Sequence, residues 1–437
     1  MLEFQKRLTN GFYALVSLPA TAMGFALSVQ ISALSWLLST KFHLDIHQVG
    51  LVWAAGPLAG IFGQVIVGLV SDKVWFWGGR RRPFIFVGGT LAALMLFLLP
   101  RIGGVNAAIG GLLGANSLLI VATLIALTLD LAINVSFNPT RSLIADVTPE
   151  GEARTKGFTW MQTVSGFWGV AAYFIGATLG NEVLISVGMV IVLLFSIIPT
   201  CFVSEPRSLE AAHEQSAGPA TSDQSQIWRI YFAHAFSWIG VQTMFVYIIA
   251  FIQQRLIAVG TSAADSATQS GRIISIAFLV LNAVGFLLPG PVFGPLARRL
   301  GRVRTHIVAL AIMALGYVAI ATLADRPLLL YALMAVVGIG WGAIVSLPFA
   351  ILSEKVERAR MGLFMGIFNL SVVLPQLFVS LALGRVIQAA PNKNIIFLIA
   401  GASLAVSAAL WLLVREQAPT GAGGNAPADP PVLRGGH

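Results

Sequence analysis

Charged side chains are scarce in this sequence. Asp, Glu, Lys and Arg make up 10% of the 437 residues, whereas 57% are hydrophobic. A soluble domain carries about 25% charged residues, so this composition excludes a soluble globular protein. It predicts a chain that crosses a membrane many times.

Cysteine is almost absent, and some catalytic motifs are missing. Cys201 is the only cysteine, which excludes an intramolecular disulfide and a thiolate metal cluster. No ATP-binding loop is present either, so the sequence indicates no primary active transport. We expect no enzyme activity, no metal and no bound cofactor.

Basic residues are in excess, and their placement predicts a membrane topology. A formal net charge of +9 also occurs in nucleic-acid-binding proteins, but no polar segment combines a basic stripe with stacking aromatics. Most of the 27 Lys and Arg residues lie in alternate loops between apolar runs. Because positive loops stay in the cytoplasm, we expect cytoplasmic termini and no nucleic-acid partner.

Twelve apolar runs are long enough to span a hydrocarbon core of about 30 Å. They lie at about 12–40, 50–70, 83–100, 116–140, 158–180, 183–203, 229–252, 272–292, 305–323, 328–352, 361–384 and 394–414. The first is too long for a signal-peptide core and is taken as a retained helix. We predict an all-α membrane protein with a six-helix bundle at 1–203, a cytoplasmic linker at 204–228, a second six-helix bundle at 229–415 and a disordered cytoplasmic tail at 416–437.

One acidic residue, Asp130, lies in the middle of an apolar run. An ideal helix places it roughly 21 Å from Asn116 and roughly 16 Å from Arg141, near the centre of the membrane. Asp130, Asn134, Asn138 and Arg141 are spaced by four, four and three residues, so they share one face of the helix. The other acidic residues are expected in loops, tails or near helix ends.

An ionisable group at that depth is costly and is usually functional. Desolvation and the nearby guanidinium of Arg141 act on the protonation of Asp130 in opposite directions. We predict that the two residues form a proton-coupling pair that separates on protonation, so that a polar substrate competes for the same groups. The alternatives are an ion pair that only fastens helices, and an Arg141 that extends to the membrane interface.

The loops after the second and eighth runs echo each other. The first contains Asp72 and the triplet Arg80, Arg81 and Arg82, and the second contains Gly294–Arg304, with Arg298 in place of the acid. Such repeats occur in many secondary transporters. We predict that Asp72 and the three arginines form a gate that pairs across the two bundles. The alternative is charge that only sets topology.

Four parts of the sequence resemble a known transporter family. They are Trp53–Gly60 (WAAGPLAG), Ser71–Ile85 (SDKVWFWGGRRRPFI), Asp130–Asp146 (DLAINVSFNPTRSLIAD), and, in the second half, Ser346–Ala350 (SLPFA) with Gly366–Gln376 (GIFNLSVVLPQ). On these motifs the chain resembles the major facilitator superfamily. More narrowly it is similar to the plant-type sucrose:proton symporters, their animal and bacterial relatives and the glycoside-pentoside-hexuronide:cation symporters. The resemblance implies the same coupling roles for Asp130 and Arg141.

The seventh helix departs from the plant pattern. The plant carriers have acidic residues beyond a Trp-Ile pair, whereas here Trp238-Ile239 is followed by no acid before Asp265. The substrate therefore need not be sucrose itself. His234 precedes the pair and has no second histidine at ligand spacing, so we expect it to pack rather than to bind a metal.

A neutral sugar needs amide, hydroxyl and aromatic partners. The candidate substrate-binding residues are Asp130, Asn134, Arg141, Gln30, Asn369, Trp238, Gln242 and Asn282. The amides could instead form interhelical hydrogen bonds, and the tryptophan could pack or face lipid. Sodium is a weaker choice of coupling ion because it needs several converging oxygens, although Asn134 and Asn138 could supply two.

These patterns together predict a monomeric proton-coupled symporter in the inner (plasma) membrane that takes up a disaccharide or glucoside such as sucrose or maltose. The lipid bilayer and the sugar are its expected partners. The alternative within transport is a carrier for another polar or cationic solute, whose charge Asp130 binds directly. A membrane enzyme would need a second acid, a nucleophile or a metal near Asp130, and a sensor would need a soluble signalling domain.

Overall fold

The computed structural model describes residues 5, 7–61, 75–149, 152–206, 222–356 and 361–416, which fold almost entirely into helices. In this part of the chain nine helices are long and apolar enough to cross a membrane. Two shorter apolar helices, Ile46–Ile61 and Ile395–Trp411, and the long helix α8 occupy three further predicted runs. The predicted all-α membrane architecture is confirmed for the described residues.

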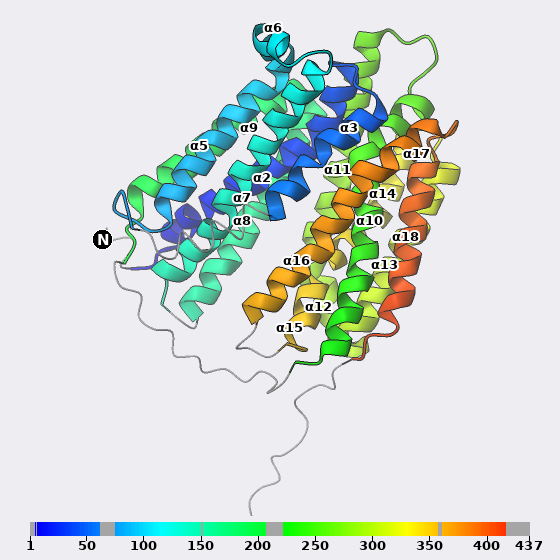
Figure 1. Cartoon of the computed structure of the whole chain (residues 1–437). Helices are drawn as coiled ribbons and strands as arrows, with labels where there is room; N and C mark the ends of the chain where they lie inside the picture. The colour runs from blue at the N-terminus through cyan, green and yellow to red at the C-terminus, as the bar shows by residue number, and fades with distance from the viewer. Residues whose placement is uncertain are drawn as a thin grey trace, which may run out of the picture.

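The first set of helices comes from the N-terminal half of the sequence (Figure 1). It comprises α2 (Asn10–Thr40), α3 (Ile46–Trp53), α5 (Arg82–Leu98), α6 (Ile102–Ile109), α7 (Ser117–Val147), α8 (Glu152–Leu179) and α9 (Asn181–Phe202). Helix α2 packs against α8 and α9, and α5 packs against α7 and α9. Polar residues cap the N-termini of α2 and α3. Thr9 accepts a hydrogen bond from the backbone N–H of Phe12, and Asp45 forms a capping box with Gln48.

The second set comes from the C-terminal half. It comprises α10 (Gln224–Arg255), α11 (Ala263–Leu287), α12 (Gly294–Leu300), α13 (Arg302–Leu323), α14 (Pro327–Ile344), α15 (Leu347–Ser353), α16 (Met361–Phe378), α17 (Gly384–Ala389) and α18 (Ile395–Trp411). Helix α10 packs against α16 and α18, and α13 packs against α14 and α18. The π-helical turns η3 (Pro289–Phe293) and η5 (Val379–Leu383) join α11 to α12 and α16 to α17.

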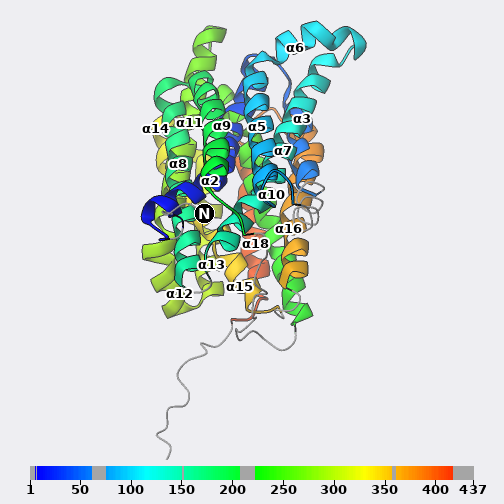
Figure 2. The same cartoon turned by 90° about the vertical axis from the view of Figure 1, so that its left-hand side faces the viewer.

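Some helices extend beyond the apolar runs or break inside them. The third run continues past residue 100 through η1 (Leu99–Arg101), α6 and η2 (Gly110–Leu112), and Figure 2 shows α6 projecting beyond the bundle. The tenth run is interrupted between α14 and α15, where Pro348 follows. Proline breaks a helix because it supplies no backbone N–H and clashes with the preceding turn. Since proline does not interrupt the apolar character of the run, hydropathy alone does not locate this break.

The two sets pack against each other through α8 and α11 and, at one end, where α3 packs against α17 and α2 packs against α11 (Figure 1). The hydroxyls of Ser32 and Ser275 lie 3.0 Å apart there, and Ser275 donates to Oδ1 of Asn181 over 2.8 Å. At the same end Arg385 donates from Nε to Nε2 of His47 over 3.1 Å. We call this the α3–α17 end.

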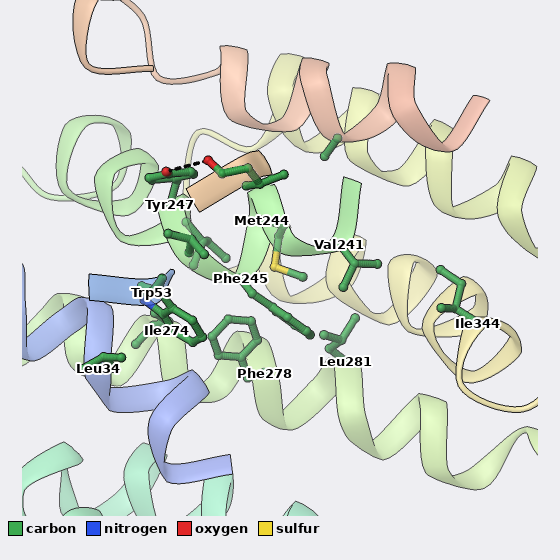
Figure 3. Packing of buried hydrophobic residues seen from close by; sticks show 14 of the residues in the cluster. Leu34, Trp53, Val241, Met244, Phe245, Tyr247, Ile274, Phe278, Leu281 and Ile344 are labelled. Carbon is green, nitrogen blue, oxygen red and sulfur yellow. Dashed lines mark hydrogen bonds between the residues drawn. The ribbon is translucent and has the colours of Figure 1, made fainter. Parts of the chain in front are cut away.

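An apolar cluster fills the space beside these polar contacts. Figure 3 shows Trp53 of α3 facing Phe245 of α10 and Phe278 of α11. The rings of Phe245 and Phe278 meet edge to face, with centroids 5.5 Å apart. The indole of Trp53 donates to the hydroxyl of Ser35 over 2.8 Å, so its polar atom is satisfied. The α3–α17 end is therefore closed by packed side chains from both sets.

Candidate coupling and substrate site

Asp130 lies inside the first set of helices, on α7. Its side chain is 5% exposed, and Gln30 of α2 donates from Nε2 to Oδ2 over 3.0 Å. A Cβ atom built on Gly56 would lie 3.4 Å from the same oxygen, so the glycine keeps the facing helix close to the carboxyl. A neutral amide and a glycine therefore lie against the carboxyl of Asp130.

Arg141 does not pair with Asp130 in this conformation. Its guanidinium lies over the ring of Phe137, 4.5 Å from the centroid, and the side chain is exposed. Among the described residues no ion pair joins it to Asp130. The two residues are eleven positions apart on α7, which corresponds to about 16 Å along the helix axis. The predicted proton-coupling pair thus stays a prediction for another step of a transport cycle.

The predicted polar face of α7 is present as a continuous helical stripe. Asn134 donates from Nδ2 to the backbone oxygen of Asp130 over 2.8 Å. Asn134 and Asn138 are both partly buried. The structure therefore gathers Asp130, Asn134 and Gln30 into one polar cluster, with Arg141 at a distance from it.

The predicted substrate residues of the second set form another cluster. The indole of Trp238 donates to Nε2 of His234 over 2.9 Å. The indole of Trp341 donates to Oδ1 of Asn282 over 3.2 Å, and the two indoles meet edge to face with centroids 6.1 Å apart. Sequence reasoning named Trp238 and Asn282 but not the histidine contact that orients the first indole.

Gln242 and Asn369 lie on α10 and α16, which also belong to the second set of helices. Gln242 is one turn after Trp238 on α10 and is 3% exposed, while Asn369 on α16 is partly buried. Neither side chain makes a hydrogen bond to another described residue. Both amides are therefore available for polar contacts that the described protein atoms do not supply.

The predicted gate residues contact a glutamate that the sequence reasoning did not select. The backbone N–H groups of Arg80, Arg81 and Arg82 each donate to the carboxylate of Glu205 over 2.8 Å. Arg81 also forms an ion pair with Asp146, 3.0 Å from Nε to Oδ2. Asp72 lies outside the described residues. Glu205 thus neutralises the positive end of α5 within the first set.

The second set repeats this arrangement. Glu416 accepts hydrogen bonds from the backbone N–H groups of Arg302 and Val303, at 2.8 and 2.9 Å, at the start of α13. A glutamine near the start of each set holds the residue before each glutamate: Gln5 accepts from the N–H of Ser204, and Gln226 from the N–H of Arg415. We call this the Glu205–Glu416 end. A repeated Val-x-Glu after the last helix of each set was the available sequence signal.

The fold and the comparison with protein families agree. A family model described as the Major Facilitator Superfamily matches residues 16–371 and, in an overlapping second match, residues 243–435. The first match covers well over half of the chain. The chain belongs to this superfamily. The resemblance predicted from the sequence motifs is confirmed.

Two proteins with curated names are similar over most of the chain, and a third over about half of it. "Sucrose transport protein SUT2" of Oryza sativa subsp. indica is 25% identical, covering 76% of this chain and 78% of that protein. "Sucrose transport protein SUC4" of Arabidopsis thaliana is 24% identical, covering 84% and 82%. The "General alpha-glucoside permease" of Schizosaccharomyces pombe is 29% identical, covering 46% and 39%.

A solved transporter structure has the same fold. The crystal structure of the nucleoside transporter NupG aligns with a TM-score of 0.70 at 12% identity, covering 93% of this chain and 99% of NupG. At that identity the likeness concerns the fold alone. The chain is therefore a multi-pass membrane transporter of the superfamily, with two facing sets of helices.

Proposed function

We propose that this chain is a proton-coupled symporter that takes up a neutral sugar, with a disaccharide or glucoside such as sucrose or maltose as the substrate. Similarity to named sucrose transport proteins and to an alpha-glucoside permease supports the substrate class. The two polar clusters, one in each set of helices, supply the amide and aromatic groups that a sugar needs.

Asp130 is the observation that carries the proposal of proton coupling. A buried, isolated carboxylate is costly when ionised, and the described partner of Asp130 is the neutral Gln30. The charge on this side chain therefore has to be compensated by a proton, by water or by a rearrangement that brings Arg141 closer. A group with that requirement links protonation to the conformation of the carrier.

We place the site between two bundles that rock about it. In this arrangement twelve spans bring both termini to the cytoplasmic side of the inner (plasma) membrane, with bundles at 1–203 and 229–415 and a linker at 204–228. The Glu205–Glu416 end then faces the cytoplasm and the α3–α17 end faces outward. The contacts that close the α3–α17 end support an inward-facing assignment for this conformation.

The test is transport by the purified full-length protein in proteoliposomes. Radiolabelled sucrose and maltose are supplied with an inward proton gradient, and sugar-for-sugar exchange is measured without a gradient. We expect Asp130→Asn to lose gradient-driven accumulation by at least about tenfold while it retains exchange, because a neutral amide cannot release a proton. Asp265→Asn, on the exposed first turn of α11, is the matched control and should behave like wild type.

Three other results would contradict parts of the proposal. Accumulation by Asp130→Asn under the proton gradient would exclude Asp130 as the coupling group. A wild-type protein that exchanges neither sugar would exclude the sugar assignment. A cationic solute that competes with protonation of Asp130 would identify a carrier in which this carboxylate binds the substrate's charge.

A further inference from the structure

His234 and Trp238 form a hydrogen-bonded pair one turn apart on α10. The indole Nε1 of Trp238 lies 2.9 Å from Nε2 of His234, and the imidazole is 1% exposed. The imidazole also stacks on Phe368 of α16, with centroids 4.6 Å apart and an angle of 19° between the planes. Contacts with two helices therefore fix His234, which in turn fixes the indole.

The hydrogen bond determines which nitrogen of His234 carries the proton. An indole N–H can only donate, so Nε2 accepts and the neutral imidazole carries its proton on Nδ1. Within the described residues Nδ1 has no hydrogen-bond partner. The hydrogen bond from Trp238 is therefore the one that this ring makes to the described residues.

The two indoles of this cluster donate their N–H groups to other residues of the second set of helices. Trp238 donates to His234, and Trp341 donates to Asn282. Both indoles remain partly exposed. Trp341 packs edge to face against Phe245 of α10, with centroids 5.3 Å apart, so it lies against the interior of the bundle. We call Trp238 and Trp341 the indole wall.

Because both indole N–H groups donate to protein acceptors, the indole wall has ring carbons and no free donor for a bound molecule. A pyranose has an apolar side formed by its C–H groups and a rim of hydroxyls, so it can place the apolar side on an aromatic face while amides bind the rim. A freed indole N–H would instead seek a hydroxyl and turn the ring away from this contact.

We propose that His234 is a positioning residue for sugar binding, which accepts the indole hydrogen of Trp238 and thereby holds the indole wall against the C–H side of a pyranose ring. The proposal rests on the proposed function, because it requires a sugar at this site. It assigns His234 a structural effect on substrate affinity without contact between His234 and the sugar.

The experiment measures exchange of radiolabelled sucrose by the full-length protein in proteoliposomes without a gradient. His234→Phe keeps a ring on Phe368 and removes the acceptor. We expect its KM to rise about three- to tenfold, the effect of losing one hydrogen bond, with kcat within about twofold. His234→Gln, whose Oε1 can take the place of Nε2, should restore KM to within about twofold of wild type.

A double-mutant cycle separates positioning from general destabilisation. Trp238→Phe removes the indole donor, so adding His234→Phe to it should raise KM no further. The matched control is His306→Phe: His306 is fully buried in the same set of helices, and its ring contacts Trp411 rather than Trp238. It should leave KM unchanged even if it lowers the melting temperature.

The outcomes distinguish this proposal from the proposed function. An unchanged KM in folded His234→Phe, or an additive effect of the two substitutions, would overturn the positioning role while sugar transport stands. Should His234→Phe not fold, the comparison of His234→Gln with His234→Leu gives the same test, since only Gln keeps an acceptor. A wild-type protein without sucrose exchange would refute the sugar site itself.

Discussion

The carboxyl of Asp130 meets an amide, not a cation. An amide has both a donor and an acceptor, so Gln30 can donate to a carboxylate and, after turning its amide group by 180°, accept from a protonated carboxyl. A guanidinium can only donate and would serve the ionised form alone. Gln30 is therefore suited to remain the partner of Asp130 in both protonation states.

Substitution of Gln30 tests this role. Gln30→Met keeps the length of the side chain and removes the hydrogen bond, and a hydrogen bond to a charged group contributes about 1.5–3 kcal/mol. We expect gradient-driven sugar uptake to fall by about tenfold or more. Ser17→Ala on the same helix is the control, because the Ser17 hydroxyl donates only to the backbone of its own helix, at Tyr13.

A loss of uptake confined to Gln30→Met, with normal amounts of folded protein, would support the pairing. Equal uptake by Gln30→Met and wild type would show that the amide is dispensable. Proteoliposome uptake and size-exclusion chromatography of the same preparations provide both measurements.

Residue spacing predicted part of this site. Intervals of four residues correctly placed Asp130 and Asn134 on one face of α7, because a helix fixes those positions locally. The partner of Asp130 could not be predicted in the same way. Gln30 comes from another helix 100 residues earlier in the chain, and only the packing of α2 against α7 brings the two together. Arg141, which shares the helix, is held instead by Phe137.

At the scale of elements, two helices begin in the same way. The N-terminal turns of α5 and α13 leave backbone N–H groups without partners in the helix, and Glu205 and Glu416 accept from them. In each case a glycine precedes these N–H groups, and a Cβ atom on Gly79 or Gly301 would collide with the glutamate. Gly301 also has a φ of 92°, which side chains other than glycine rarely adopt.

Removal of the two glutamates should destabilise the helices that they cap, α5 and α13, to different degrees. Glu205 is half-buried whereas Glu416 is exposed, so we expect Glu205→Ala to cost about 2 kcal/mol and Glu416→Ala about 1 kcal/mol. Differential scanning fluorimetry in detergent would report the change as a lower melting temperature. Glu182→Ala, which removes an exposed ion pair with Lys41, is the control and should have little effect.

The opposite order of melting temperatures, or a control that is as unstable as Glu205→Ala, would contradict this interpretation of the caps.

The sequence predicted the similarity between the two arginine-rich loops, because glycine and arginine recur in both. It did not reveal the caps, since each glutamate lies more than a hundred residues from the helix that it caps.

At the scale of the whole molecule, the hydrogen bonds between the two sets of described helices lie at the α3–α17 end. Ser32 and Asn181 of the first set meet Ser275 of the second, and Trp36 of the first set donates to the backbone oxygen of Ala267 in the second over 2.7 Å. These side chains come from α2, α9 and α11. A carrier that works by alternating access has to separate them once in each cycle.

A reversible cross-link tests whether this end opens. Replacing Cys201, the only cysteine, with Ser leaves a chain without thiols, into which Ser32→Cys and Ser275→Cys are introduced. The two hydroxyls lie 3.0 Å apart, so sulfur atoms at these positions can approach the bonding distance of a disulfide. We expect oxidation to reduce sugar exchange to background and dithiothreitol to restore it. Each single-cysteine variant, treated in the same way, should retain exchange. Full exchange by a completely cross-linked protein would mean that transport proceeds without separation of α2 and α11, and the opening would then have to be sought elsewhere along the boundary between the two sets.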